Sequence, residues 1–220
     1  MNIKNQKSVA LIVAHPDDET LWAGGTILSH PSWKCFVVCL CRKSDEERAT
    51  KFQKALAILG SEGIMGDMDD GPSQEPLDED EVERTITGLL PHKHFNLIIT
   101  HNPTGEYKRH IRHEETSRAV IKLWFAGKIS ANELWTFAYK EDGTGKYPQP
   151  IKTASVYKPL TRRILLKKYK IITETYGFDK NSFEAETNPK AEAFWQFVSS
   201  YDAKRWLGNG GIKNESISII

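Results

Sequence analysis

The sequence lacks the features of a disulfide scaffold, a membrane protein or a nucleic-acid binder. Its 220 residues include three cysteines, and 30 Lys and Arg stand against 29 Asp and Glu, which leaves a formal net charge of +1. Balanced charge argues against a dedicated nucleic-acid-binding protein. No apolar run is long enough for a membrane span, and the stretch 9–14 is too short for the apolar region of a signal peptide. We therefore expect a cytoplasmic protein.

The cysteines are close together in one strand-like segment. Cys35, Cys39 and Cys41 leave an odd thiol under any pairing, which disfavours a disulfide framework. Cys39 and Cys41 would share one face of a strand, where a soft metal ion could bind. The other face is apolar as well, with Phe36 and Val38, and this is typical of a strand buried on both faces. We favour inert core thiols.

Apolar runs alternate with helical patterns along the first two thirds of the chain. Segments 8–14, 34–41, 95–100 and 133–138 have the composition of buried strands. Segments 21–28, 46–59, 78–90 and 114–125 have helical periodicity, with Gly60 and Pro91 as stop signals for two of them. This β-α repeat predicts an α/β fold in which helices flank both faces of a parallel sheet.

The pattern weakens after Ala138. Helices are expected at about 160–176 and 189–198, while the short strand-like pieces 154–157 and 217–220 have no clear place in the sheet. We expect one domain over residues 1–220, with a core at about 8–140. The remainder, about 141–220, is expected to be a C-terminal elaboration that closes over this core.

Two polar clusters follow predicted strands. The first strand runs into the sequence from His15 to Glu19, and the strand 95–100 is followed by His101, His110 and His113. Ligands of open parallel α/β sheets bind at the carboxyl ends of the strands. An imidazole, a carboxylate three residues later and a second imidazole from a neighbouring loop can form a three-ligand zinc site that leaves a position for water. A helix cap would also explain the acids 17–19, and the spacing alone leaves both interpretations open.

The segment from Ala14 to Glu19 resembles the signature of the LmbE-like, or PIG-L, deacetylase superfamily, whose members remove acyl groups from N-acylated sugars and related amines. Further motifs are similar: Arg48 followed by Leu59-Gly60, the turn 69–71, and 105–107 with the histidines at 110 and 113. The resemblance covers about residues 8–140. It implies a Rossmann-like parallel sheet, in agreement with the alternation of strands and helices.

The resemblance also implies roles for individual residues. It makes His15, Asp18 and His113 the zinc ligands, Asp17 the general base for the attacking water, and His110 the acid or oxyanion partner. Zinc would lower the pKa of its water toward about 7 and polarise the amide carbonyl. The positions that match substrate contacts are Arg48 and Asp69 or Asp70. Tyr107 could also contact the substrate, by a hydrogen bond to a tetrahedral intermediate, or could simply pack. For Arg48 and the two aspartates, a solvated helix residue and an ordinary turn are equally good explanations.

Two positions depart from the family pattern. Arg112 stands where the second histidine motif usually has an orienting aspartate, and Lys51 stands where the helix often has a glutamate. A guanidinium cannot support a charged imidazole, so either Arg112 points away or His110 works as a neutral hydrogen-bond donor. Glu106, Glu114 or an acid from elsewhere could supply the missing carboxylate.

The function expected from the sequence is a zinc-dependent N-deacetylase acting on an N-acylated amino sugar, such as an N-acetylglucosamine derivative, or on a small sugar conjugate. Other divalent metals, such as Fe²⁺, suit the same ligands. Two alternatives stay open: a metal-dependent amidase for another small amide conjugate, and a homologue that binds without turnover. We expect no nucleic-acid partner, and the sequence leaves open whether the chain forms a homo-oligomer.

Overall fold

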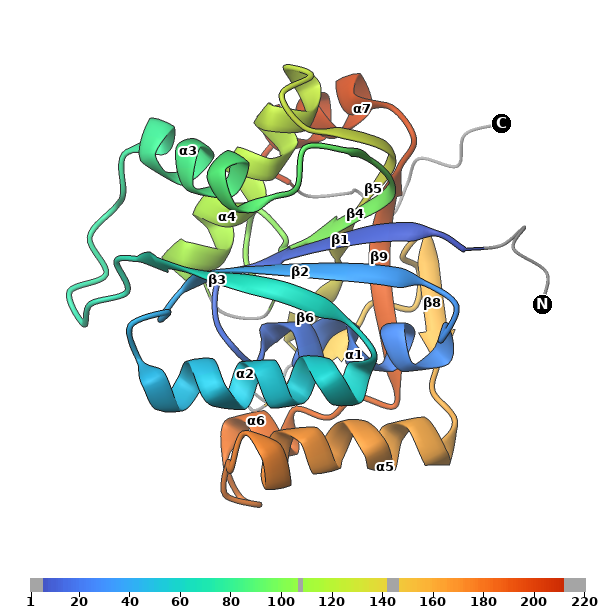
Figure 1. Ribbon diagram of the computed structural model, residues 1–220. Helices are drawn as coiled ribbons and strands as arrows, with labels where there is room; N and C mark the ends of the chain where they lie inside the picture. The colour runs from blue at the N-terminus through green and yellow to red at the C-terminus, as the bar shows by residue number, and fades with distance from the viewer. Residues whose placement is uncertain (1–5, 107–108, 142–146, 212–220) are drawn as a thin grey trace.

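Helices cover both faces of a seven-stranded sheet in the computed structural model, which describes residues 6–106, 109–141 and 147–211 (Figure 1). The sheet order is β3-β2-β1-β4-β5-β9-β8, and β6 and β7 form a separate pair. The strands are β1 (Ser8–Val13), β2 (Lys34–Cys41), β3 (Glu62–Met68), β4 (His94–Thr100), β5 (Ser130–Phe137), β6 (Tyr139–Glu141), β7 (Pro148–Pro150), β8 (Val156–Pro159) and β9 (Ala191–Phe197). The helices are α1 (Asp18–Ser29), α2 (Glu46–Leu59), α3 (Glu79–Leu89), α4 (Ile111–Phe125), α5 (Arg162–Lys170), the π-helical turn η2 (Ile171–Thr175), α6 (Phe183–Glu186) and α7 (Ser200–Gly208).

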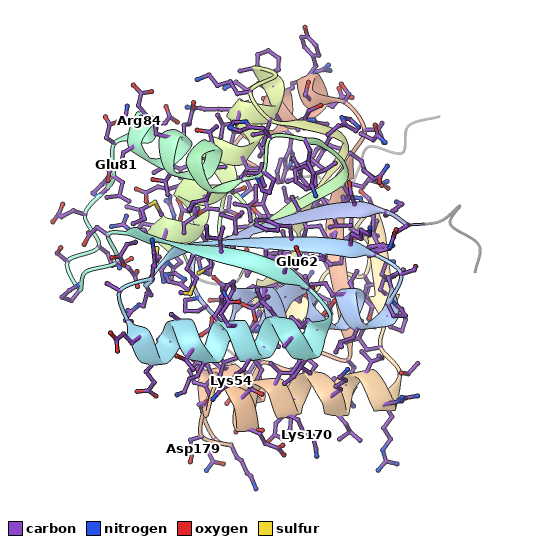
Figure 2. All side chains as sticks on the ribbon, viewed as in Figure 1. Lys54, Glu62, Glu81, Arg84, Lys170 and Asp179 are labelled. Carbon is purple, nitrogen blue, oxygen red and sulfur yellow. The ribbon has the colours of Figure 1, made fainter. Side chains whose placement is uncertain are left out.

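Strands β1 to β5 are parallel, whereas β9 and β8 extend the sheet in antiparallel pairing. Helices α1, α2 and α5 lie on one side of the sheet and α3, α4 and α7 on the other (Figure 1). The fold class expected from the sequence, a Rossmann-like parallel sheet flanked by helices, is therefore confirmed. Charged residues such as Arg84 on α3 and Lys170 on α5 are exposed on the two outer layers (Figure 2).

Each central strand contributes to two apolar cores because its side chains alternate between the faces. In β1, Leu11 and Val13 pack toward α1 and α2, while Ala10 and Ile12 pack toward α3 and α4. The three cysteines of β2 are buried and free, and burial raises the pKa of each thiol. They belong to these cores, as the apolar strand pattern indicated.

Two local expectations differ from the structure. The helix expected at 189–198 is wrong, because β9 occupies this segment and pairs with both β5 and β8. Phe194 packs into one core while Trp195 and Phe197 pack into the other, so burial on both faces overrides the local helical preference of Ala and Glu. The edge strand β3 was not among the expected strands, and its Gly63 and Gly66 weaken the strand pattern.

No helix of the described residues has the length and apolar character that a bilayer crossing needs.

Candidate active site

The polar loops after β1 and β4 meet at one edge of the sheet. These strands are hydrogen-bonded neighbours within the sheet. The chain continues from β1 to β2 on one side of the pair and from β4 to β5 on the other, and ligands of such folds usually bind in the crevice between these two connections. A cleft of about 290 Å³ opens there. Its lining consists of His15, Pro16, Asp17, Asp18, Leu21, Trp22, Arg42, Arg48, Asp70, His110, His113, Phe183 and Glu184.

Three side-chain atoms in the cleft form a nearly equilateral triangle. His15 Nδ1 lies 3.1 Å from His113 Nε2 and 3.3 Å from Asp18 Oδ2, and the last two atoms are 3.4 Å apart. Tetrahedral ligands at zinc distances of 2.0–2.1 Å are about 3.3 Å from one another. The residues that the resemblance assigns to the metal therefore have the donor types and spacing to hold a divalent cation.

Glu106 fixes the orientation of His113. The Nδ1–H of His113 donates to Glu106 Oε2 at 2.5 Å. This hydrogen bond leaves the lone pair of Nε2, the atom that belongs to the triangle, available for a cation. Glu106 is buried, and although burial raises its pKa, the imidazoles of His101 and His113 hold the pKa at about 2. This carboxylate–imidazole arrangement is typical of the outer shell of metal sites.

The other two members of the triangle are held in a similar way. His15 Nε2 lies 3.1 Å from Asp70 Oδ1, so this carboxylate can fix the tautomer that directs Nδ1 to the triangle. Asp18 accepts hydrogen bonds from the Trp22 indole through Oδ1 and from the backbone N–H of His15 through Oδ2. Burial alone would lower the pKa of His15, but the carboxylates of Asp18 and Asp70 raise it to about 8.

His101 also lies near the triangle, 3.4 Å from Asp18, and other histidine groupings are close enough to share an ion: His15 with His110 and His113, or His101 with Asp18 and His113. Both nitrogens of His101 are already engaged, however. Nε2 accepts the backbone N–H of Ala14 at 3.0 Å and Nδ1 donates to Glu106 at 2.9 Å. His101 thus supports the site through Glu106, and its nitrogens are not free for a ligand.

Asp17 is held with strained backbone geometry beside the triangle. Its φ of 137° lies in a region that costs a non-glycine residue about 1–3 kcal/mol. Asp17 occupies the N-cap position of α1, yet its side chain makes no capping hydrogen bond and lines the cleft instead, with Oδ2 3.4 Å from Arg48 Nη1. Burial and the charge of Asp18 raise the pKa of Asp17 well above its usual value. These properties suit a proton acceptor better than a helix cap.

His110 stacks on His113, with ring centroids 4.4 Å apart, and its edge meets His15 at 4.8 Å. Burial and these two imidazoles lower the pKa of His110 to about 4, so its ring is neutral near pH 7. Within the described part of the chain, its buried Nδ1 has no hydrogen-bond partner. A buried polar atom without a partner is expected where a ligand or water completes the site.

Arg112 points away from His110. Its guanidinium is fully buried and donates to Glu115 Oε2 at 2.7 Å and to the backbone oxygens of Asp69 at 2.5 Å and Glu75 at 2.9 Å. The family's orienting carboxylate is thus replaced by a residue that ties α4 to the 69–75 segment. Glu114, the other acid considered, pairs with Arg109 and Arg118.

The four expected substrate contacts have different placements. Arg48 and Asp70 line the cleft, although Asp70 is engaged by His15 and Arg42. Asp69 does not line the cleft, because its carboxylate accepts from the Gly71 N–H and faces Arg112. Tyr107 lies outside the described residues.

Sequence reasoning missed five residues of the cleft, of which Leu21 and Trp22 belong to α1. Arg42 has a φ of 67° and its guanidinium binds Asp70 Oδ2 at 2.9 Å. Phe183 and Glu184 come from α6, in the segment where no motif was recognised. The Arg-Lys pair at the end of β2 was the available signal for Arg42, whereas α6 carries no local signal for a site.

Comparisons with known proteins agree with this architecture. Residues 10–124 match the family model described as PIG-L, GlcNAc-PI de-N-acetylase. Uncharacterized protein L374 of Acanthamoeba polyphaga mimivirus is 24% identical over 187 residues, which cover 78% of this chain and 79% of that protein.

Solved structures are similar at the level of the fold. The N,N'-diacetylchitobiose deacetylase of Pyrococcus horikoshii has a TM-score of 0.66 at 18% identity, covering 89% of this chain and 85% of that one. GalB, the 4-carboxy-2-hydroxymuconate hydratase of Pseudomonas putida, has a TM-score of 0.56 at 17% identity, covering 95% of this chain and 92% of that one.

Proposed function

The chain belongs to the PIG-L family of GlcNAc-PI de-N-acetylases, and on this premise we propose that it is a metal-dependent hydrolase that removes an acyl group from an N-acylated amino sugar or a small sugar conjugate. The observation that carries the proposal is the triangle of His15 Nδ1, Asp18 Oδ2 and His113 Nε2. Its edges of 3.1–3.4 Å match a tetrahedral zinc ligand set.

We assign the metal to these three residues, with zinc as the first choice and Fe²⁺ as an alternative for imidazole and carboxylate ligands. Asp70 and Glu106 supply the outer carboxylates that direct the two histidines. When bound, the cation would supply Lewis-acid activation of the amide carbonyl and of the attacking water.

The chain's own groups supply the proton transfers. Asp17 is the general base that accepts a proton from the attacking water, because it lines the cleft beside the triangle and its raised pKa makes it more basic than an ordinary aspartate. The proton then passes to the departing amine, so that the products are a carboxylate and a free amine. His110, neutral near pH 7, donates a hydrogen bond to the carbonyl oxygen as negative charge develops there.

The cleft suits a small polar substrate. Its volume of about 290 Å³ is at the lower end of the range for ligand sites. Arg48, Arg42 and Glu184 offer hydrogen-bonding groups around the histidine cluster, and the half-buried Phe183 offers an apolar surface. We propose Arg48 as a substrate contact, and Asp70 as a support for His15.

Residues 141–220 complete the same domain in this proposal. Strands β8 and β9 continue the sheet, and α6 contributes Phe183 and Glu184 to the cleft. We therefore propose one deacetylase domain whose C-terminal elaboration contributes to the active site.

The sequence also allows a homologue that binds without turnover and an amidase for another small conjugate. A homologue without turnover was suggested by the missing carboxylate at Arg112, but Glu106 and Asp70 provide carboxylates to both histidines of the triangle, which supports turnover. An amidase for a different small conjugate would use the same groups. The fold does not decide the reaction, since it also occurs in a hydratase.

The proposal is tested by measuring acetate and free amine released from a panel of substrates. The panel should hold N-acetylglucosamine, its phosphate and glycoside conjugates, an N-acetylated amino acid and an N-acetylated thiol conjugate. Release from the sugars alone supports the sugar deacetylase, and release only from the others supports the amidase. Metal-loaded protein that releases acetate from none of them would contradict the proposed function.

A further inference from the structure

We propose that residues 176–178, which follow η2, position the Asp17 carboxylate from two sides. This positioning segment consists of Tyr176, Gly177 and Phe178. The inference rests on the proposed function, because Asp17 is a general base only within it. Tyr176 and Phe178 act through other side chains, so they are positioning residues and not catalytic residues.

The first route runs from Tyr176 to the backbone of Asp17. The Tyr176 hydroxyl donates to Glu19 Oε1 at 2.8 Å, and Glu19 Oε2 accepts the backbone N–H of Asp17 at 3.0 Å. Glu19 is fully buried, so its orientation depends on these donors and on the Thr20 hydroxyl. Because Asp17 has a φ of 137°, its unusual backbone needs such a fixed partner.

The π-helical turn directs Tyr176 toward Glu19. The Tyr176 N–H donates to the Ile171 carbonyl at 2.9 Å, one residue further back than in an α-helix. One extra residue in the turn rotates the following side chain by about 100° around the helix axis. Ile171 and Ile172 are buried, and η2 packs on α1 and α2. The insertion is thus anchored in the core and changes where Tyr176 points.

The second route runs from Phe178 to the carboxylate of Asp17. Gly177 has a φ of 79°, which turns the chain so that the Phe178 ring lies 5.1 Å from the Arg48 guanidinium. Arg48 Nη1 is in turn 3.4 Å from Asp17 Oδ2. An aromatic face on one side of a guanidinium restricts where the guanidinium can point. Phe178 therefore helps Arg48 to hold the carboxylate of Asp17. Tyr176 and Glu19 hold the backbone of the same residue.

This positioning segment lies beyond residues 10–124, the part that matches the family model. The proposed base, Asp17, is therefore positioned by a distant part of the chain: Tyr176 is 157 residues away in sequence from Glu19, to which it donates. A change in the segment should alter the chemical step while the metal ligands stay intact.

The first test compares Tyr176→Phe with Tyr139→Phe. Tyr139 is the matched control, because its buried hydroxyl also binds α1, at the Trp22 carbonyl 3.2 Å away, but has no link to Asp17. We expect Tyr176→Phe to lower kcat about tenfold with KM within twofold and metal content unchanged. Tyr139→Phe should keep kcat within twofold. An equal loss in both variants, or none in Tyr176→Phe, would overturn the first route.

A double variant shows whether Tyr176 acts through Glu19. Glu19→Gln loses one acceptor, and Tyr176→Phe in that background should cause little further loss of kcat if the two residues form one chain. Additive losses would contradict the chain from Tyr176 through Glu19.

On the second route, Phe178→Ala should lower kcat about fivefold. Phe178→Tyr should keep kcat within twofold of the unmodified protein, since either aromatic ring can face Arg48. Failure of Phe178→Tyr to keep kcat would refute that route.

A crystal structure of Tyr176→Phe separates this inference from the proposed function. If the unmodified protein releases no acetate, the proposed function fails, yet the geometry of Asp17 can still be compared in the two proteins. We expect the Asp17 N–H to lose its contact with Glu19 and its carboxylate to move from the cleft in the variant. An unchanged Asp17 would overturn the positioning role whether or not the protein is active. If Tyr176→Phe does not fold, Phe178→Ala decides the proposal by the same comparison.

Discussion

Glu106 Oε2 lies 2.5 Å from His113 Nδ1, and the other oxygen of the same carboxylate lies 2.9 Å from His101 Nδ1. One buried acid thus orients two stacked imidazoles, whose ring centroids are 3.9 Å apart. It fixes the tautomer in which His113 directs Nε2 into the cleft. The orienting group therefore comes from the loop after β4 and not from position 112.

We predict that Glu106→Gln weakens metal binding by about 10–100-fold, because an amide orients and polarises His113 less strongly than a carboxylate does. Glu114→Gln is the control, since Glu114 is equally buried but pairs with Arg109 and Arg118. Zinc affinity measured by competition with a chelator decides the matter. Equal affinities of the two variants would remove Glu106 from the support of the site.

We predict that His113→Ala loses most of its bound zinc, because one of three ligands is gone. His92→Ala is the control, since His92 is exposed and precedes the amino end of β4, whereas the triangle lies at the carboxyl ends of the strands. Elemental analysis of the purified proteins measures the effect, and circular dichroism confirms that the fold is kept. If His113→Ala retained as much zinc as His92→Ala, His113 would not be a ligand.

Asp17→Asn should keep its metal and lose turnover by a factor of about 10²–10⁴, since the amide cannot accept a proton. Asp18→Asn should instead weaken metal retention, because it replaces an anionic ligand by a neutral one. Steady-state kinetics and metal content are measured on both variants. Turnover above about a third of the original in Asp17→Asn is incompatible with a general base at this position.

Arg112→Ala should act on stability more than on chemistry. Its loss leaves Glu115 and the backbone oxygens of Asp69 and Glu75 without their buried partner, and we expect a destabilisation of about 3 kcal/mol in urea unfolding. Turnover per folded molecule should change less than tenfold, whereas His110→Ala should lower it at least a hundredfold. Similar kinetic losses in the two variants would mean that Arg112 takes part in catalysis.

The strand–helix alternation allowed the core of the fold to be predicted from the sequence. Leu11 and Ile12 lie on opposite faces of β1 and both are apolar, and a continuous apolar run of this kind can be recognised from a few neighbouring residues. The β9 segment could not be predicted in the same way. Its Ala and Glu residues favour a helix locally, and only pairing with β5 makes it a strand.

The candidate site shows the same limit. The segment 15–19 and the histidines at 110 and 113 were identified because each of these two motifs spans only a few consecutive residues. The link from Tyr176 to Glu19 joins residues 157 positions apart, and no local pattern indicates it. The role of Arg112 also depended on where its guanidinium points, which the sequence left open between two choices.

The most direct test of the account is the dependence of acetate release on metal content. Protein stripped by a chelator should release no acetate from the best N-acetylated sugar of the panel, and stepwise addition of Zn²⁺ or Fe²⁺ should restore the rate until one ion is bound per chain. Asp17→Asn should bind the same one ion and stay inactive. Full activity in the stripped protein, or a metal-loaded protein without activity on any acetylated substrate, would contradict the account.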